Sequence, residues 1–194
     1  KARSLSALVQ LHIVWMGWAD TPTEALRLAA ETARAAVQLD EQDPWAHLAL
    51  GQTNSYARNH EDAVAAIRKA IDLNPSFAMA HAWLGIVLGY AGMPEGAIDE
   101  IDQAVRISPL DPFNAIYPAF RSVVHFAAGR YEEALAEARR SVRERPEFIG
   151  AWRMLVISLA HLGRIEEARD ALVEAKRLQP GISGSGVCPL GTRG

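Results

Sequence analysis

The stretch LGYAGMPEGAIDEIDQAVRISPLDP, from Leu88 to Pro112, decides how the chain folds. Glycines precede a charged amphipathic run, and prolines follow it. Apolar residues separated by steps of three and four are typical of a helix with one buried face. Because proline lacks the backbone N–H that a helix needs, the helix is expected to end before Pro109.

The same features return at a constant spacing. Gly51 and Gly85 lie 34 residues apart, and the same distance separates Pro75 from Pro109. A period of this length predicts stacked repeats, because a single unit cannot cover its own apolar face. The same spacing also separates Ala63 and Ala97, Ala70 and Ala104, Gly129 and Gly163, Ala134 and Ala168, and Pro146 and Pro180.

Each repeat is expected to fold as two antiparallel helices joined by a short turn. In the second helix of one repeat, Val64, Ile67 and Ile71 lie on one stripe. Arg68 and Asp72 face the opposite side. Small residues at the repeating alanine and glycine positions would let the helix backbones approach closely.

The fourth repeat departs from this pattern. Three extra residues, 112–114, precede it. Asp111 followed by Pro112 is a strong helix-start signal, with a capping carboxylate and a proline in the first turn. This predicts a longer first helix, from about Pro112 to Ala128, with a kink at Pro118 where a backbone hydrogen bond is lost.

Composition excludes several classes of function. The formal net charge of −3, from 20 basic and 23 acidic residues among 194, gives no field that would attract nucleic acid or an anionic membrane. The single cysteine, Cys188, can form neither an intramolecular disulfide nor a cysteine metal cluster. No stretch is apolar and long enough to span a bilayer. We expect a cytoplasmic location, and the start at Lys1 suggests a piece of a longer polypeptide.

Catalytic, metal and cofactor sites are not expected. His47 and His81 occupy equivalent places in successive repeats, about 10 Å apart, which is too far to share an ion, so packing or hydrogen bonding in the stack is favoured. The pair Glu132–Glu133 opens a second helix, where the helix dipole stabilises negative charge. The arginine-rich run 139–145 has glutamates before it on the same helix and is interpreted as a solvated face.

The closing segments GRYEEALAEARRSVRERP and GRIEEARDALVEAKRLQP resemble the tetratricopeptide repeat (TPR). The resemblance implies an all-α fold, a right-handed solenoid of about five stacked antiparallel helix pairs within residues 1–182. We place the repeats at 10–43, 44–77, 78–111, 115–148 and 149–182. The first is the weakest, with Glu41 where the closing proline would stand. Residues 183–194 are expected to form a flexible tail.

In this family the first helix of each repeat lines the concave surface. Transferring the family's inner positions selects an apolar wall rich in aromatic residues, which also includes Leu11, Met79 and Ile116. Chaperone-binding members hold a peptide's terminal carboxylate with Lys, Asn and Arg, but only three extended polar residues are present here, so such a clamp is not expected. The candidate partner-binding residues are Trp18, Trp45, Gln52, Tyr56, Tyr90, Phe126, Arg153 and His161.

A second resemblance covers three shorter stretches. They are similar to the C-terminal TPR arrays of bacterial class III adenylate cyclases and winged-helix transcription regulators. The stretches are AVRISPLDPFNA, HFAAGRYEEALAEARRSV and AWRMLVISLAHLGRIEEARDAL. This resemblance implies a non-catalytic interaction or regulatory module of a larger signalling protein, which binds a protein or peptide partner, or its own N-terminal domain. Two alternatives stay open. In the first, longer helices or the tail of the chain itself fill the groove. In the second, the groove wall or a terminal repeat beginning with LVQLHIVWMGW pairs with a second copy.

Overall fold

The computed structural model describes residues 1–16 and 18–180. Within these residues the chain forms ten α-helices and one 3₁₀ helix, with no strand. The helices are α1 (Ala2–Trp15), α2 (Pro22–Leu39), α3 (Pro44–Tyr56), α4 (His60–Leu73), α5 (Ala78–Tyr90), α6 (Pro94–Ile107), η1 (Pro112–Ile116), α7 (Tyr117–Ala127), α8 (Tyr131–Glu144), α9 (Ile149–His161) and α10 (Ile165–Leu178).

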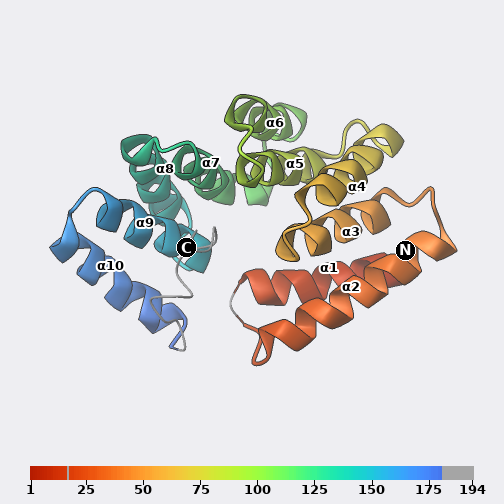
Figure 1. The fold of residues 1–194 in the computed structure, drawn as a ribbon, viewed down its shortest axis with the longest axis horizontal. Coiled ribbons are helices and arrows are strands. Elements are labelled where there is room, and N and C mark those ends of the chain that lie inside the picture. The colour runs from red at the N-terminus through yellow and green to blue at the C-terminus, as the bar shows by residue number, and fades with distance from the viewer. Residues whose placement is uncertain (17, 181–194) are drawn as a thin grey trace.

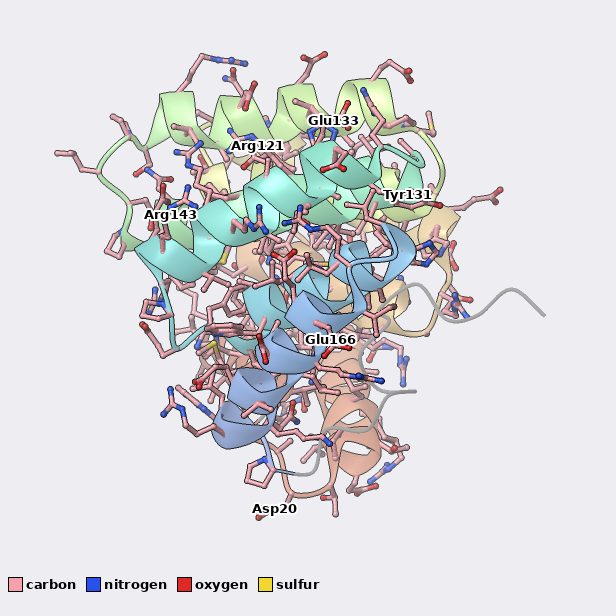
Figure 2. All side chains as sticks on the ribbon, turned by 90° about the vertical axis from the view of Figure 1, so that its left-hand side faces the viewer. Asp20, Arg121, Tyr131, Glu133, Arg143 and Glu166 are labelled. Atoms are coloured by element: carbon pink, nitrogen blue, oxygen red, sulfur yellow. The ribbon has the colours of Figure 1, made fainter. Side chains whose placement is uncertain are left out.

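Five antiparallel helix pairs stack into a curved array (Figure 1). The odd-numbered helices line the inner, concave side, and the even-numbered helices form the outer layer. Charged side chains such as Glu133, Arg143 and Glu166 cover the outside of α8 and α10 (Figure 2). The predicted all-α solenoid of helix pairs is confirmed.

The turns inside the pairs share one backbone geometry. In the four pairs from α3–α4 to α9–α10 the residue at the turn is left-handed: Arg58 has φ 64°, Gly92 78°, Gly129 75° and Gly163 72°. The next amide donates back to a carbonyl in the last turn of the inner helix, as Met93 N–H does to Leu88 O at 2.9 Å. Glycine adopts this conformation without a steric penalty, which explains its recurrence at this place.

The corners between consecutive pairs are closed by a recurring hydrogen bond. A side chain in the first turn of each inner helix, or of η1, donates to the backbone carbonyl six residues earlier. The bonds are His47 Nε2 to Glu41 O at 2.9 Å, His81 Nε2 to Pro75 O at 3.1 Å, Asn114 Nδ2 to Ser108 O at 2.9 Å and Trp152 Nε1 to Pro146 O at 2.7 Å. The expectation that His47 and His81 are hydrogen-bonded in the stack is confirmed.

Small residues let the two helices of a pair touch, as expected. A Cβ at Gly85 would lie 2.5 Å from Ala97 O and 2.6 Å from Ile101 Cγ1, and one at Gly51 would lie 2.3 Å from Ile67 Cγ1. Such distances are far below van der Waals contact, so no larger residue fits without movement.

The fourth repeat corrects one prediction. Asp111 caps as expected, because its Oδ1 accepts a hydrogen bond from Phe113 N–H at 2.9 Å. The expected single kinked helix from Pro112 to Ala128 is absent. A 3₁₀ helix ends at Ile116 and a new α-helix begins at Tyr117, with Pro118 in its first turn. Proline is tolerated in a first turn, where its missing N–H costs no helical bond, so the chain restarts the helix instead of bending it.

The first pair also differs from the expected repeat at 10–43. Helix α1 begins at Ala2 and ends at Trp15, about two turns ahead of the position that the 34-residue spacing predicts. Thr21 and Pro22 start α2 early, with proline in the first turn, so the inner helix must end sooner. The end of α2 keeps the spacing, since the C-caps Asp40 and Asn74 lie 34 residues apart. The predicted tail, 183–194, lies outside the described residues.

Candidate peptide-binding groove

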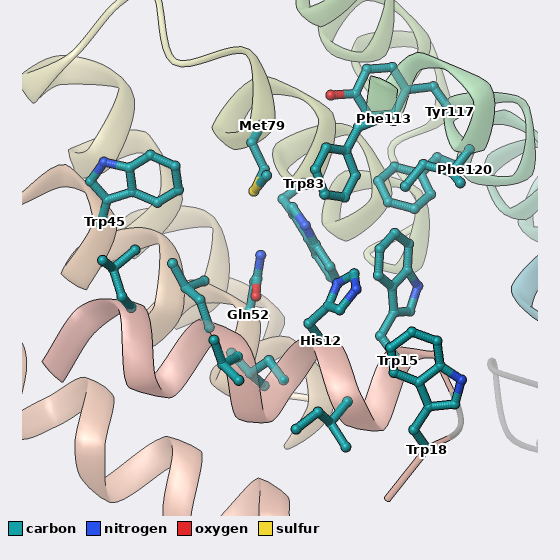
Figure 3. Close-up of a pocket in the computed structure, with 16 residues that line it drawn as sticks. His12, Trp15, Trp18, Trp45, Gln52, Met79, Trp83, Phe113, Tyr117 and Phe120 are labelled. Atoms are coloured by element: carbon teal, nitrogen blue, oxygen red, sulfur yellow. The ribbon is translucent and has the colours of Figure 1, made fainter. Parts of the chain in front are cut away.

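An apolar pocket of about 420 Å³ lies between α1 and the inner helices of the next repeats (Figure 3). One wall is the face of α1, and the opposite wall comes from α3, α5, η1 and α7. The lining residues are Leu5, Leu8, Val9, Leu11, His12, Ile13, Trp15, Trp18, Trp45, Gln52, Met79, Trp83, Phe113, Ile116, Tyr117 and Phe120.

Three large apolar side chains of this lining remain in contact with solvent. Leu5 is 51 %, Val9 58 % and Trp18 64 % exposed. Leu5 and Val9 lie one helical turn apart on α1, so they form a stripe along the rim. Exposed apolar surface in a concave site is costly in water and marks a binding surface.

Trp15 joins the first repeat to the far end of the array. Its ring centroid lies 4.8 Å from Phe148, 5.6 Å from Phe120 and 6.0 Å from Trp83. Figure 3 shows Trp15 pointing from α1 toward the inner helices. Phe148, which is 1 % exposed, is the last residue of the fourth repeat and the N-cap of α9, so the first repeat meets the start of α9 across the concave side. The chain therefore fills part of its own groove and leaves the pocket beside α1.

Few polar groups line the pocket. Gln52 is buried, and His12 packs edge-on against Phe113 with ring centroids 6.3 Å apart. Burial lowers the pKa of His12, and the positive charge of Arg145 lowers it further, so the imidazole is neutral at neutral pH. Burial raises the pKa of Tyr117, which keeps its hydroxyl protonated. The pocket is thus uncharged and suits apolar side chains.

The eight predicted binding residues fall into three groups. The first group, Trp18, Trp45 and Gln52, lines the pocket. Trp45 also packs on Phe77, the N-cap of α5, with ring centroids 4.5 Å apart. The wall positions Leu11, Met79 and Ile116 line the pocket as well.

The second group is Tyr56, Tyr90 and Arg153. The two tyrosines are the last residues of α3 and α5, and Arg153 lies in α9. Burial raises the pKa of Tyr56, while the charge of Arg153 acts in the opposite direction. The charge of Arg153 and the two tyrosines influence one another, although these residues come from the second, third and fifth repeats.

The third group is Phe126 and His161, which pack with Tyr131. The Phe126 and His161 rings are perpendicular, with centroids 4.8 Å apart, and Tyr131 lies 5.1 Å from Phe126 and 4.8 Å from His161. His161 is exposed and Phe126 is 7 % exposed. These residues form an aromatic cluster at the ends of α7 and α9, away from the pocket lining.

Sequence reasoning missed the residues that give the pocket most of its aromatic surface: His12, Trp15, Trp83, Phe113, Tyr117 and Phe120. Family positions could not select His12 and Trp15, because α1 is displaced along the chain. Trp83 could have been identified as a lining residue from its size, because a tryptophan beside the small residues of an inner helix is large enough to reach the neighbouring helices.

Within residues 1–16 and 18–180, no group of three His, Cys, Asp or Glu residues could hold a metal ion. No helix in this part of the chain combines the length and apolarity needed to cross a membrane.

A family model of the tetratricopeptide repeat matches residues 48–112 and 121–181, more than half of the chain. The chain belongs to the tetratricopeptide repeat family. No curated protein matches this TPR chain in a sequence search.

Solved TPR structures share the fold at low sequence identity. The type IV pilus biogenesis factor PilW is 17 % identical, with a TM-score of 0.71 over 96 % of this chain and 81 % of that one. MamA 41-end from Desulfovibrio magneticus RS-1 is 18 % identical, with a TM-score of 0.56 over 92 % and 96 %. YrrB, described as a TPR protein with an unusual peptide-binding site, is 19 % identical, with a TM-score of 0.52 over 82 % and 80 %.

Proposed function

We propose that this TPR chain is a protein-interaction module that binds an apolar segment of a partner, a peptide or a helix, in the pocket beside α1. The observation that carries the proposal is the open aromatic pocket with Leu5, Val9 and Trp18 exposed at its rim. Its volume of about 420 Å³ is enough for several side chains of a bound segment. Aromatic anchors in such a cavity are the usual source of binding energy at interfaces.

The family and the fold support this function. TPR arrays are interaction scaffolds, and the similar YrrB structure is described as having a peptide-binding site. The neutral lining favours a partner segment that contributes leucine, phenylalanine or similar side chains rather than charged ones at this place.

Selection from a displayed peptide library on the immobilised chain tests the proposal. We expect enriched peptides to carry apolar and aromatic residues, and their affinity to fall at least about tenfold in Val9→Asp, because a carboxylate on the rim must lose water when the segment binds. Val173→Asp is the matched control, since Val173 is 64 % exposed on α10 and Val9 is 58 % exposed on α1. Equal affinity for the two variants would place the binding site elsewhere.

We further propose that the module is cytoplasmic and part of a larger bacterial signalling protein. The resemblance of three sequence stretches to the C-terminal arrays of cyclases and winged-helix regulators supports this. Co-purification of the array with the neighbouring domain of its own polypeptide, lost in Val9→Asp, would indicate regulation within one chain. An unchanged complex would contradict binding through the pocket.

Self-association is the alternative use of the exposed apolar surface. Leu28 and Leu39 on α2 are 43 % and 68 % exposed at the end of the stack, where a further repeat would normally pack. Light scattering over a range of concentrations separates the two functions. A constant monomer mass would remove self-association, whereas a dimer lost in Leu39→Asp would support it.

A further inference from the structure

Gln52 is the side-chain amide in the lining of the apolar pocket. It belongs to α3 and is 4 % exposed, and Figure 3 shows its amide among the lining side chains. Within residues 1–16 and 18–180 this amide has no hydrogen-bond partner. Neither of its atoms is among the fully enclosed, unpaired side-chain atoms of this part of the chain, so both remain open toward the pocket.

The other polar side chains of the lining cannot replace this amide. The hydroxyl of Tyr117 is unpaired but fully enclosed. The two ring nitrogens of His12 point in different directions, so they do not present a donor beside an acceptor, and the indole N–H groups only donate. Among the described lining residues, Gln52 therefore offers the one adjacent donor and acceptor.

Binding of an apolar segment changes the cost of the Gln52 amide. In the open pocket, solvent can reach its oxygen and its nitrogen. A segment that fills the pocket displaces this solvent, so the amide must pair with the segment or lose its hydrogen bonds without replacement. Tight binding therefore requires a polar group of the segment against Gln52.

We propose that Gln52 makes the pocket select an extended segment, in which the backbone N–H and C=O of one residue pair with the Gln52 amide. Gln52 Oε1 accepts a hydrogen bond from that N–H, and Gln52 Nε2 donates one to that C=O. The inference rests on the proposed function, because it states which conformation of the partner segment the same pocket takes.

Backbone hydrogen bonding argues for an extended segment rather than a helix. The N–H and C=O groups inside a helix are already bonded to one another, so a helix backbone would cover Gln52 without pairing with it. An extended segment has free backbone groups, which lose solvent against the apolar lining and also need partners. Pairing with Gln52 removes both costs at once.

The spacing along α3 places this pairing relative to the apolar anchor. Trp45 and Gln52 lie seven residues apart in α3 and both line the pocket. Seven residues are nearly two helical turns, so the two side chains share one face and are separated by about 10.5 Å along the helix axis. An extended chain advances about 3.3 Å per residue. The paired residue should therefore lie about three residues from the one that packs on Trp45.

A scan of backbone esters in a selected peptide tests the pairing. Each variant replaces one amide by an ester, which removes one N–H without changing a side chain. We expect one position, about three residues from the apolar anchor, to weaken binding to the wild-type chain about tenfold. Binding to Gln52→Met, which keeps the length of the side chain, should change less than about twofold at that position. A scan without any position whose effect depends on Gln52 overturns the inference.

Two further measurements test the other groups that could face Gln52. The carbon-13 shifts of the labelled peptide in the complex should be those of an extended backbone, and helical shifts overturn the inference. Exchange of each Asn, Gln, Ser or Thr of the peptide for Ala should not reproduce the loss seen with the ester. A loss that depends on Gln52 and follows a peptide side chain instead of an ester would overturn the backbone pairing.

A small probe separates this inference from the proposed function. The probe is N-acetyl-leucine methylamide, and the control is N-acetyl-leucine methyl ester, which lacks one N–H and has a weaker carbonyl acceptor. In nitrogen-15 NMR of the full chain, the probe should shift the Gln52 side-chain amide resonance saturably, and the ester should bind at least about threefold more weakly. The resonance is assigned by its loss in Gln52→Met.

The two proposals fail in different ways. If selected peptides bind and the Gln52 resonance stays unchanged, or responds equally to the probe and the ester, the backbone pairing is wrong while the pocket function stands. If the probe shifts Gln52 and no peptide is selected, the proposed function fails, and the selection of an extended partner segment fails with it.

Discussion

In the second and third repeats the inner helix lies directly against its outer helix, because Gly51 and Gly85 leave no side chain between them. The first repeat is held differently. Where it meets the second repeat, Ala7, Ala33 and Ala49 form a small separate cluster with the partly buried Leu8 and Leu50 packed against it, and most large side chains of the core belong to another cluster. Alanines bury little area, and stabilisation by burial scales with area.

Two longer contacts therefore fix the first repeat. Trp15 inserts among Trp83, Phe120 and Phe148, and Ser4 Oγ donates to Asp43 Oδ2 at 2.6 Å in a buried position. The comparison shows that a repeat with a weak interface can be retained by single side chains that reach distant parts of the array. It also predicts that the first repeat opens more readily than the inner ones.

Removing the Trp15 ring should have the largest effect on the difference in stability between the first repeat and the inner repeats. Trp15→Ala is expected to lower the free energy of unfolding by about 3 kcal/mol, because the ring fills the space between three aromatic neighbours. Hydrogen exchange should show the loss first in α1 and α2. Trp152→Ala, which removes a tryptophan of the fifth repeat, is the control and should not accelerate exchange in α1. Uniform acceleration in both variants would contradict a separate first repeat.

Filling the close helix contact should destabilise the inner repeats instead. Gly85→Ala is expected to cost about 2 kcal/mol, because the new Cβ would meet the Ala97 carbonyl and Ile101. Gly96→Ala in α6 is the matched control, since its nearest atom would be Leu88 Cδ1 at 3.8 Å, and it should stabilise by about 0.5 kcal/mol. Chemical denaturation of the wild type, Gly85→Ala and Gly96→Ala measures the expected loss and the expected gain in the free energy of unfolding. A stable Gly85→Ala chain would show that the helices can separate freely.

The contribution of the Ser4–Asp43 hydrogen bond to the stability of the first repeat should depend on pH. Burial alone would raise the pKa of Asp43, but the hydrogen bonds from Ser4 Oγ and Trp45 N–H outweigh it and hold the pKa below its ordinary value. Ionised Asp43 thus stabilises the fold above about pH 4, and this contribution is lost as the pH falls through the lowered pKa. Asp43→Asn should cost about 1 kcal/mol at neutral pH and progressively less below pH 4.

Denaturation at a series of pH values measures the Asp43→Asn difference. Asp111→Asn is the control, because Asp111 caps a helix start in the same way through Phe113 N–H without contacting α1. Exchange in α1 should accelerate only in Asp43→Asn. A difference between wild type and Asp43→Asn that stays constant down to pH 2 would contradict the assignment.

The smallest predicted effect concerns the turn of the second repeat. Arg58 has φ 64°, whereas Gly92, Gly129 and Gly163 occupy the matching turns. Arg58→Gly should relieve roughly 0.5–1 kcal/mol of backbone strain, because glycine adopts this conformation freely, and the loss of the Arg58 side-chain interaction subtracts from this gain. Gly163→Ala should destabilise by about 1 kcal/mol, since no atom lies within 4 Å of the new Cβ and only the backbone strain counts. Thermal denaturation that ranks the two changes otherwise would show that side-chain contacts outweigh the backbone.

Most of the fold could be predicted because its causes repeat along the sequence. The turn glycines, the cap of Asp111 and the hydrogen-bonded His47 and His81 each follow from local chemistry at a fixed spacing. The displacement of α1 was missed, because the Thr21–Pro22 helix start competes with the repeat spacing and prevails.

The repeat spacing selected part of the candidate pocket lining, and Trp18 and Leu11 also line it although α1 is displaced. Trp45 and Gln52 occupy family positions in an ordinary repeat and line the pocket. Tyr56 and Tyr90 are the last residues of their helices and lie outside the pocket lining. The contact of Trp15 with Phe148 joins α1 to the N-cap of α9, and no periodic pattern encodes a contact between residues so distant in sequence.

The contact between Trp15 and Phe148 also has a mechanical consequence. A solenoid with free ends stretches like a spring, since each repeat can tilt slightly on the next. Here the Trp15 ring ties α1 to α5, α7 and the N-cap of α9, so pulling α1 away from these helices must first detach the indole from its aromatic neighbours. Below that force the contact stiffens the array, and above it each repeat is free to tilt.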